Sequence, residues 1–172
     1  MPATASRAAL PVAPMGRFYN GKDWEGDITT MIDRAEIETL IPHKHAMCLW
    51  DEVLSWDAQR IHLRASNHRD SAHPLRSDGQ LRALHLCEYG AQAMAVHGGL
   101  LARAAGEVAK PGLLVALRDV QLHVVRIDDL PEAIECVAEQ LAASETSQQY
   151  AFRISHAGTL LAEGRATVML GV

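Results

Sequence analysis

The sequence lacks an excess of basic residues and lacks paired cysteines, and each absence excludes a class of protein. Its 16 Lys and Arg residues are outnumbered by 21 Asp and Glu residues, which gives a net charge of -5. A nucleic-acid-binding protein would instead show a basic stripe that matches the phosphates. The three cysteines, Cys48, Cys87 and Cys136, lie far apart in apolar surroundings, so neither a disulfide framework nor a C-x-x-C metal site is supported. This pattern indicates a reducing cytoplasm.

A long uninterrupted apolar run is also missing. Residues 1–15 are rich in Ala and Pro, but they lack the continuous apolar region that a signal peptide needs. The longest weakly polar run, residues 84–96, contains Glu, Gln and His, which is typical of a core helix rather than of a membrane span. We therefore expect a cytoplasmic protein without an export signal and without a membrane span.

The length and the local patterns predict one domain. A chain of 172 residues is long enough for one hydrophobic core but short for two. Residues 1–30 mix Pro, Gly, Ser and scattered charges without a steady period, and we expect an irregular lead-in there. The domain itself is expected over residues 31–172.

Within this domain, one long apolar helix stands among segments with strand patterns. A capping box from Asp33 to Glu36 begins a short helix that Pro42 ends. A longer helix is expected over residues 81–104, after a loop rich in turn-forming residues. Strands are predicted at residues 49–56, 60–67, 113–126, 133–143, 148–155 and 160–170, with a hairpin turn at 156–159. This order predicts an α+β fold in which an antiparallel sheet wraps around, or packs onto, the long helix.

Glu88 is a carboxylate inside the apolar run of the long helix. Carboxylates are almost never fully buried unless they are paired, and a desolvated carboxylate has a raised pKa that suits it to general acid catalysis. The alternative is a structural carboxylate that caps or pairs inside a dimer interface. We interpret Glu88 as the leading candidate for a catalytic acid.

Three segments together resemble bacterial (3R)-hydroxyacyl-acyl-carrier-protein dehydratases of the FabA/FabZ type. Residues 37–53 are similar to the opening helix of that family, its L-P-H-R-Y-P-F segment and its first strand, and residues 88–92 (E-Y-G-A-Q) to its E-A-M-A-Q. The strands after Pro111 follow the same order. Because Ser71-Ala72-His73-Pro74-Leu75 stands where that family has G-H-F-P-G, the chain is most similar to the divergent dehydratase-like proteins of aryl-polyene biosynthesis clusters. The resemblance implies a hotdog fold, an antiparallel sheet wrapped around a long central helix.

The resemblance also implies a reaction, the dehydration of a 3-hydroxyacyl thioester, or its reverse, in fatty-acid or polyene-type biosynthesis. In that family a histidine takes a proton from C2, and the helical acid protonates the departing C3 hydroxyl. Glu88 matches the acid and His73 the histidine, while His85 is a rival base because it lies three residues before Glu88 on the same helix face. A backbone N–H at Ala83 stands where a donor would polarise the thioester carbonyl.

Other polar residues flank the expected site. Gln92, one turn after Glu88, has an amide that could hydrogen-bond the carboxylate or a ligand, or be purely structural. Arg82, with Arg76 and Arg103, could contact the phosphate of a pantetheine carrier or an acidic carrier protein, or be a solvated surface arginine.

His43, His45 and Cys48 superficially suggest a metal site. The resemblance assigns this stretch to a structural turn, and no second ligand pair lies at zinc spacing, so we expect no metal. We likewise expect no other cofactor, because the acyl group is carried on the phosphopantetheine of acyl carrier protein or on coenzyme A. In the family that the chain resembles, the active site lies between two subunits, and the resemblance therefore implies a homodimer or an assembly of dimers.

Two rival functions remain open. In a hotdog thioesterase, the carboxylate of Glu88 would activate water or attack the thioester carbonyl itself. The altered loop around His73 favours the second rival, a non-catalytic acyl-binding or partner subunit, which would bind an acyl thioester tightly without turnover and would keep its affinity in Glu88→Gln.

Overall fold

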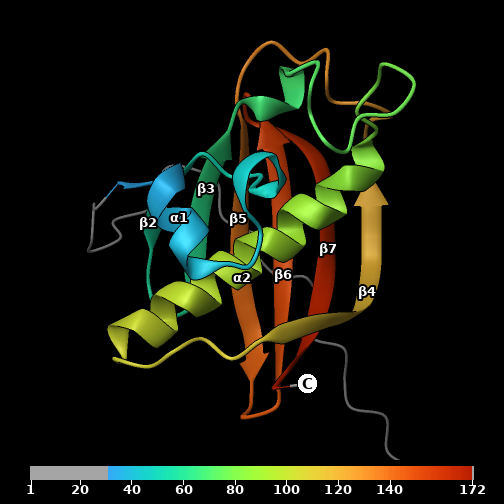
Figure 1. The fold of residues 1–172 in the computed structure, drawn as a ribbon. Helices are drawn as coiled ribbons and strands as arrows, with labels where there is room; N and C mark the ends of the chain where they lie inside the picture. The colour runs from blue at the N-terminus through green and yellow to red at the C-terminus, as the bar shows by residue number, and fades with distance from the viewer. Residues whose placement is uncertain (1–30, 172) are drawn as a thin grey trace, which may run out of the picture.

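The structure, a computed structural model, describes residues 31–171 (Figure 1). The expected lead-in over residues 1–30 lies outside the described residues. Within residues 31–171, the strands form one seven-stranded sheet of order β1-β2-β3-β5-β6-β7-β4, and all neighbouring strands are antiparallel. The strands are β1 (Ile32–Asp33), β2 (Glu52–Trp56), β3 (Arg60–Ala65), β4 (Gly112–Leu122), β5 (Ile134–Ala143), β6 (Ser147–His156) and β7 (Thr159–Leu170). The helix α2 (Leu86–Ala104) crosses one face of this sheet, which confirms the predicted α+β hotdog architecture.

The short helix α1 (Arg34–Leu40) begins and ends where the sequence predicts. The N-cap Asp33 accepts a hydrogen bond from the N–H of Glu36 at 2.9 Å, which pairs one of the free donors of the first turn. At the other end, Nζ of Lys44 donates to the carbonyl of Ile41 at 2.8 Å. This contact holds the turn after α1, from which the chain runs across α2.

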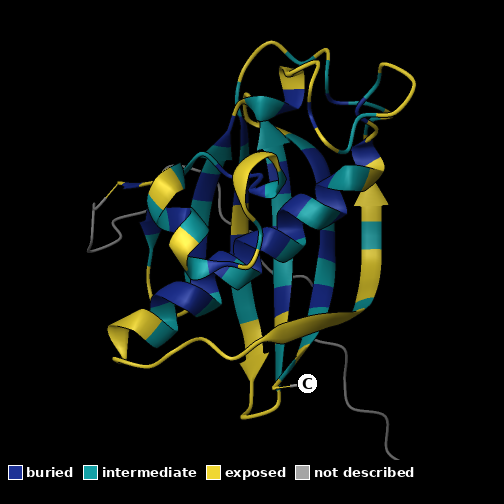
Figure 2. Ribbon diagram, viewed as in Figure 1, coloured by how far each residue is buried: buried dark blue, intermediate teal, exposed yellow. Residues whose placement is uncertain are grey.

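Helix α2 is buried on two sides, between the sheet and residues 41–50, which we call the covering segment (Figure 2). Its closest approach to the sheet is at Gly90, where an added Cβ would lie 2.7 Å from Cγ of Phe152 in β6. A helix this close to an aromatic ring has no room for a side chain. Gly90 therefore lets this turn of α2 lie close to β6.

The close contact at Gly90 predicts a loss of stability in Gly90→Ala. The new methyl group would overlap the buried ring of Phe152, and overpacking of this kind costs about 1 to 3 kcal/mol. Gly98→Ala is the matched control, because a Cβ there meets only Oε1 of Gln148 at 3.6 Å. Chemical denaturation should show Gly90→Ala less stable than wild type and Gly98→Ala equally or more stable, since Ala favours a helix by about 1 kcal/mol. Equal effects of the two changes would contradict the packing described.

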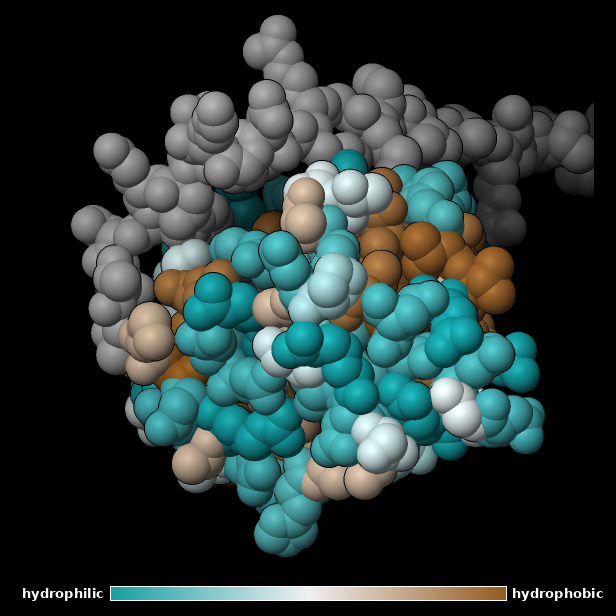
Figure 3. Space-filling view, turned by 90° about the horizontal axis from the view of Figure 1, so that it is seen from above, coloured by the Kyte–Doolittle hydropathy of each residue, from teal (hydrophilic) through white to brown (hydrophobic). Residues whose placement is uncertain are grey.

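Strand β4 lies at the edge of the sheet and is almost wholly exposed (Figures 1 and 2). The predicted strand at 113–126 ends earlier, at Leu122, because the chain then turns toward the start of α2, where the N–H of Ala83 donates to the carbonyl of Val125 at 2.9 Å. Large apolar side chains are exposed on and beside this strand: Leu113, Leu114, Val115, Leu117, Leu122 and Val125. Seen from above, hydrophobic residues gather on the side of the molecule where β4 lies (Figure 3).

No helix within residues 31–171 is both long and apolar enough to cross a membrane.

Candidate active site

The side-chain amide of Gln92 joins α2 to the covering segment and is fully buried. Its Oε1 accepts a hydrogen bond from the N–H of Leu49 at 2.9 Å, and its Nε2 donates to the carbonyl of Met47 at 2.9 Å. The same Nε2 donates to Oε1 of Glu88, also at 2.9 Å. A flipped amide would set donor against donor at Leu49 and acceptor against acceptor at Met47 and Glu88. The amide nitrogen is therefore fixed toward Glu88.

Two more hydrogen bonds hold the covering segment in place. The indole Nε1 of Trp50 donates to the carbonyl of Tyr89 at 2.9 Å, and Nδ2 of Asn67 donates to the carbonyl of Leu49 at 2.8 Å. Trp50 also packs edge-on against the ring of Tyr89, with 5.2 Å between ring centroids. These contacts place the covering segment over the first turns of α2, where Glu88 lies.

The carboxylate of Glu88 has one oxygen held and one oxygen free. Oε1 accepts the hydrogen bond from Gln92 and lies 3.4 Å from Nε2 of His43. Oε2 has no hydrogen-bond partner among the residues that the structure describes. The side chain is 34% exposed in the single chain, so it is less buried than its apolar neighbours in the sequence suggest. A carboxylate arranged in this way can present Oε2 to a bound substrate.

The ring of His73 is buried, and both of its nitrogens are engaged. Nδ1 accepts a hydrogen bond from the N–H of Leu75 at 3.2 Å, so the ring hydrogen is on Nε2, which donates to the hydroxyl of Tyr89 at 3.0 Å. That hydroxyl donates in turn to Oδ1 of Asn67 at 2.7 Å. Burial, with smaller contributions from the nearby charges of His85 and Arg76, lowers the pKa of His73 to about 4. In this arrangement His73 is neutral, and its lone pair faces the backbone.

The low pKa of His73 predicts how the effect of His73→Asn on stability changes with pH. Between pH 6.5, the ordinary pKa of histidine, and about pH 4, the unfolded chain takes up a proton at this ring that the folded chain does not. The folded state therefore loses about 3 kcal/mol of stability relative to the unfolded state as the pH falls through this range. In His73→Asn this loss is absent, so the stability difference from wild type should shrink by that amount between pH 7 and pH 4.

The check is chemical denaturation of wild type and His73→Asn at several pH values in this range. His45→Asn is the matched control, because His45 is exposed and its positive φ of 52° is one that Asn tolerates. A stability difference between wild type and His73→Asn that stays constant with pH would contradict the buried, neutral ring.

The other predicted site residues lie around the start of α2. The side chain of His85 makes no hydrogen bond or ion pair within the described range, although its charge is close enough to affect the pKa of His73. The N–H of Ala83 is not free, because it donates to Val125. Arg82 is half-exposed and lies 3.8 Å from the carboxylate of Asp78. The structure thus brings Gln92 to Glu88, and within residues 31–171 no hydrogen bond or ion pair joins His73 or His85 to that carboxylate.

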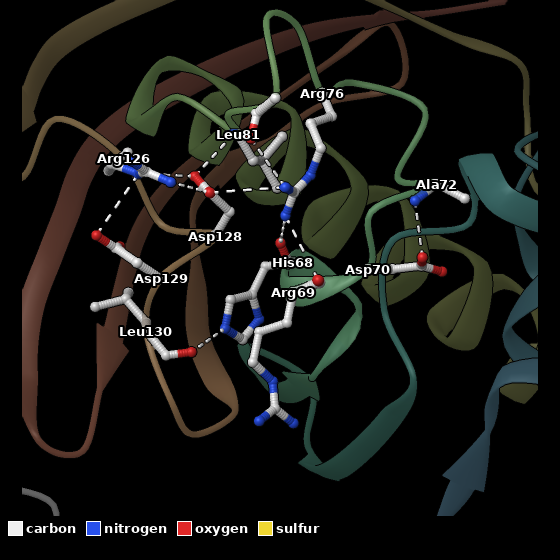
Figure 4. Close-up of polar contacts among 11 residues, drawn as sticks. His68, Arg69, Asp70, Ala72, Arg76, Leu81, Arg126, Asp128, Asp129 and Leu130 are labelled. Atoms are coloured by element: carbon white, nitrogen blue, oxygen red, sulfur yellow. Dashed lines mark hydrogen bonds and ion pairs between the residues drawn. The ribbon is translucent and has the colours of Figure 1, made fainter.

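An ion-pair cluster fixes the loop that carries His73 (Figure 4). The carboxylate of Asp128 accepts a hydrogen bond from the N–H of Leu81 at 2.9 Å, lies 3.7 Å from Nη1 of Arg76, and hydrogen-bonds Arg126. The hydrogen bond from Arg126 is the main reason that the pKa of Asp128 falls to about 2. Arg76 also donates to the carbonyl of Gly79 at 3.0 Å. Arg76 therefore holds the loop together. The sequence had left open contact with a carrier phosphate or a solvated surface arginine, and the side chain is only 15% exposed, so it is not a solvated surface arginine.

The residue that sequence reasoning missed is His43. The sequence assigned it to a structural turn, yet Nε2 of its ring lies 3.4 Å from Oε1 of Glu88. The available signal was its position directly after Pro42, in the segment that resembles L-P-H-R-Y-P-F of the dehydratases. Within residues 31–171, no group of three or more His, Cys, Asp or Glu residues is placed to hold a metal ion.

Comparison with known proteins shows where the chain belongs. A family model described as ApeP dehydratase, of the ApeP-like family, matches residues 35–171. The chain is a member of the ApeP-like dehydratase family. This confirms the resemblance to the dehydratase-like proteins of aryl-polyene clusters. Among curated protein sequences, no significant match to this ApeP-like chain is found.

Solved structures share the hotdog fold of this ApeP-like chain. The dehydratase heterocomplex ApeI:P from Xenorhabdus doucetiae matches with a TM-score of 0.71 and 24% identity, over 78% of this chain and 90% of that chain. Thioesterase superfamily member 2 from zebrafish matches with a TM-score of 0.55 and 16% identity, over 81% and 99%. A hypothetical thioesterase from Streptococcus pneumoniae, with coenzyme A, matches with a TM-score of 0.51 and 11% identity, over 69% and 83%. At these identities the likeness concerns the fold alone.

Proposed function

We propose that this chain dehydrates a 3-hydroxyacyl thioester, or hydrates the corresponding enoyl thioester, with Glu88 as the acid. The observation that carries the proposal is the carboxylate with Oε1 held by Gln92 and Oε2 free, on the helix that the ApeP-like family shares. A catalytic acid must be within hydrogen-bond reach of the group to which it gives its proton. Oε2 satisfies this requirement for a ligand that enters beside the covering segment.

In the proposed reaction, a base removes a proton from C2 and the resulting electron pair forms the C2–C3 double bond. The C3–O bond breaks as Glu88 gives its proton to the hydroxyl, and water leaves. Each of these proton transfers contributes about 100- to 10,000-fold to the rate. We propose a histidine as the base. The ring of His85 makes no hydrogen bond or ion pair with the described residues, whereas His73 would have to give up its bonds to Leu75 and Tyr89 before it could take a proton.

The acyl group would be carried on the phosphopantetheine of acyl carrier protein or on coenzyme A, in the cytoplasm. The proposed chemistry requires only proton transfers, so it assigns no metal or redox cofactor. Support for a thioester carrier comes from the shared fold, since the Streptococcus pneumoniae protein of this fold is described with coenzyme A. Arg82, half-exposed beside the start of α2, is the residue that we propose for contact with the carrier.

We further propose that the chain works in an assembly joined through the edge of its sheet. The apolar side chains on β4 are exposed in the single chain, and a contiguous apolar surface of this kind marks an interaction site. The β4 edge also leaves backbone groups for pairing with another strand. The Xenorhabdus doucetiae structure is described as a dehydratase heterocomplex, ApeI:P, and we propose a homodimer or a similar complex for this chain.

The rival reaction is thioester hydrolysis, in which Glu88 would activate water or attack the carbonyl. Incubation of the purified, assembled protein with a 3-hydroxyacyl thioester separates the two reactions. We expect enoyl absorbance to rise without release of free thiol. Thiol release without an enoyl product would establish the thioesterase. Tight binding without either product would establish a non-catalytic acyl-binding subunit.

A further inference from the structure

The ring of His43 is held beside Glu88 by anchors on both sides of it in the covering segment. His43 follows Pro42 at the end of α1, and the next residue, Lys44, is tied to the carbonyl of Ile41. Farther along, Met47 and Leu49 are both bound to the amide of Gln92. The covering segment is thus anchored on both sides of His43, which leaves the ring little freedom to move away from Glu88.

The hydrogen on the ring of His43 can be assigned from burial. Nδ1 is buried and has no hydrogen-bond partner among the described residues, whereas Nε2 lies 3.4 Å from Oε1 of Glu88. A hydrogen on Nδ1 would be a buried donor without an acceptor, and Nε2 would then face the carboxylate of Glu88 without a hydrogen to donate. A hydrogen on Nε2 costs less, because the carboxylate can accept it. We therefore assign the hydrogen to Nε2, the ring nitrogen that lies 3.4 Å from Oε1 of Glu88.

Two donors then converge on one oxygen of Glu88. Nε2 of Gln92 donates to Oε1 at 2.9 Å, and Nε2 of His43 approaches the same atom. The distance of 3.4 Å is long for a hydrogen bond, as is common for catalytic contacts before a substrate closes the site. Both nitrogens lie on the side of Oε1, and Oε2 has no hydrogen-bond partner among the described residues. The pair fixes the plane of the carboxylate and so decides which oxygen meets the substrate.

We propose that His43 is a positioning residue for Glu88, which holds Oε1 from Nε2 so that Oε2 delivers the proton to the C3 hydroxyl. This inference rests on the proposed function. It assigns His43 no contact with the substrate, because Nδ1 is buried and Nε2 faces Glu88. It therefore predicts an effect on the chemical step rather than on binding.

Steady-state kinetics of three variants test the role. His43→Ala should lower kcat by about 10- to 100-fold with KM nearly unchanged, the range expected for a lost hydrogen bond to a charged group. His43→Gln should recover most of this loss, because its amide nitrogen reaches about as far as Nε2 and donates in the same way. His45→Asn, two residues away and exposed, should behave as wild type. Equal kcat values for His43→Ala and His45→Asn, with wild-type enzyme active, would overturn the positioning role.

A measurement that needs no turnover separates this inference from the proposed reaction. Ring nitrogen-15 spectra of the full-length protein should show hydrogen on Nε2 of His43, and the Nε2 signal should move in Glu88→Ala. Hydrogen on Nδ1, or a signal that does not change in Glu88→Ala, would overturn the inference. If wild type forms no enoyl product, the proposed reaction fails, and the spectra still decide whether His43 holds Glu88.

Discussion

Replacing Glu88 by Gln should reduce the formation of enoyl thioester by about 100- to 10,000-fold, the contribution of one well-placed general acid. A side-chain amide keeps the size of the carboxyl group and can still accept the hydrogen bond from Gln92 through its oxygen. It has no proton to give to the C3 hydroxyl, so the C3–O bond would have to break with hydroxide as the leaving group. Steady-state kinetics with a 3-hydroxyacyl thioester measure the loss, which should fall on kcat.

The same change should leave the fold intact, because the Glu88 side chain is one-third exposed and forms one short hydrogen bond. Thermal unfolding and size-exclusion chromatography of Glu88→Gln should therefore match wild type. Glu38→Gln is the matched control, since Glu38 lies in α1 and its carboxylate has no hydrogen bond or ion pair within residues 31–171. If Glu88→Gln turns over substrate as fast as Glu38→Gln, Glu88 is not the acid.

The second large effect is expected in Gln92→Met, this time on stability as well as activity. Met is close to Gln in size but cannot hydrogen-bond in its place, so the N–H of Leu49 and the carbonyl of Met47 would lose their partner beside a fully buried side chain. Unpaired buried groups cost about 1 to 3 kcal/mol each. We expect the free energy of unfolding to fall by about 3 to 5 kcal/mol, and kcat to fall about tenfold in the fraction that remains folded.

Denaturant unfolding of Gln92→Met and Gln149→Met provides the comparison. Gln149 lies in β6 and is exposed, so the same substitution there should change stability by less than about 0.5 kcal/mol. Similar losses in both variants would mean that the amide of Gln92 does not hold the covering segment on α2.

The elements of the fold could be predicted because each has a local signal. Asp33 and Glu36 mark the start of α1, and the hydrogen bond between them is observed. A hairpin turn was predicted at residues 156–159 between two strands, and Ala157 and Gly158 do adopt the positive φ angles of a tight hairpin. The apolar run of α2 likewise predicted a long helix with the sheet wrapped around it or packed onto it.

The predictions that were wrong or stayed open concern contacts between residues that are distant in the sequence. The strand predicted to reach Arg126 ends at Leu122, because Val125 pairs with Ala83 instead of with β7. The contact between His43 and Glu88 requires the covering segment to lie across α2, and Gln92 achieves this with backbone groups of Met47 and Leu49. Backbone partners leave no trace in the residue types, so the sequence could not show which histidine lies at Glu88.

The most direct test of the central claim is a crystal structure of the assembled E88Q variant with a 3-hydroxyacyl thioester bound. The account predicts that the C3 hydroxyl lies about 2.6 to 3.2 Å from the atom at position 88 that replaces Oε2, while Gln92 and His43 face the other atom of that group. A thioester carbonyl at this position, with the C3 hydroxyl directed elsewhere, would contradict the assignment of Glu88 as the acid of a dehydratase.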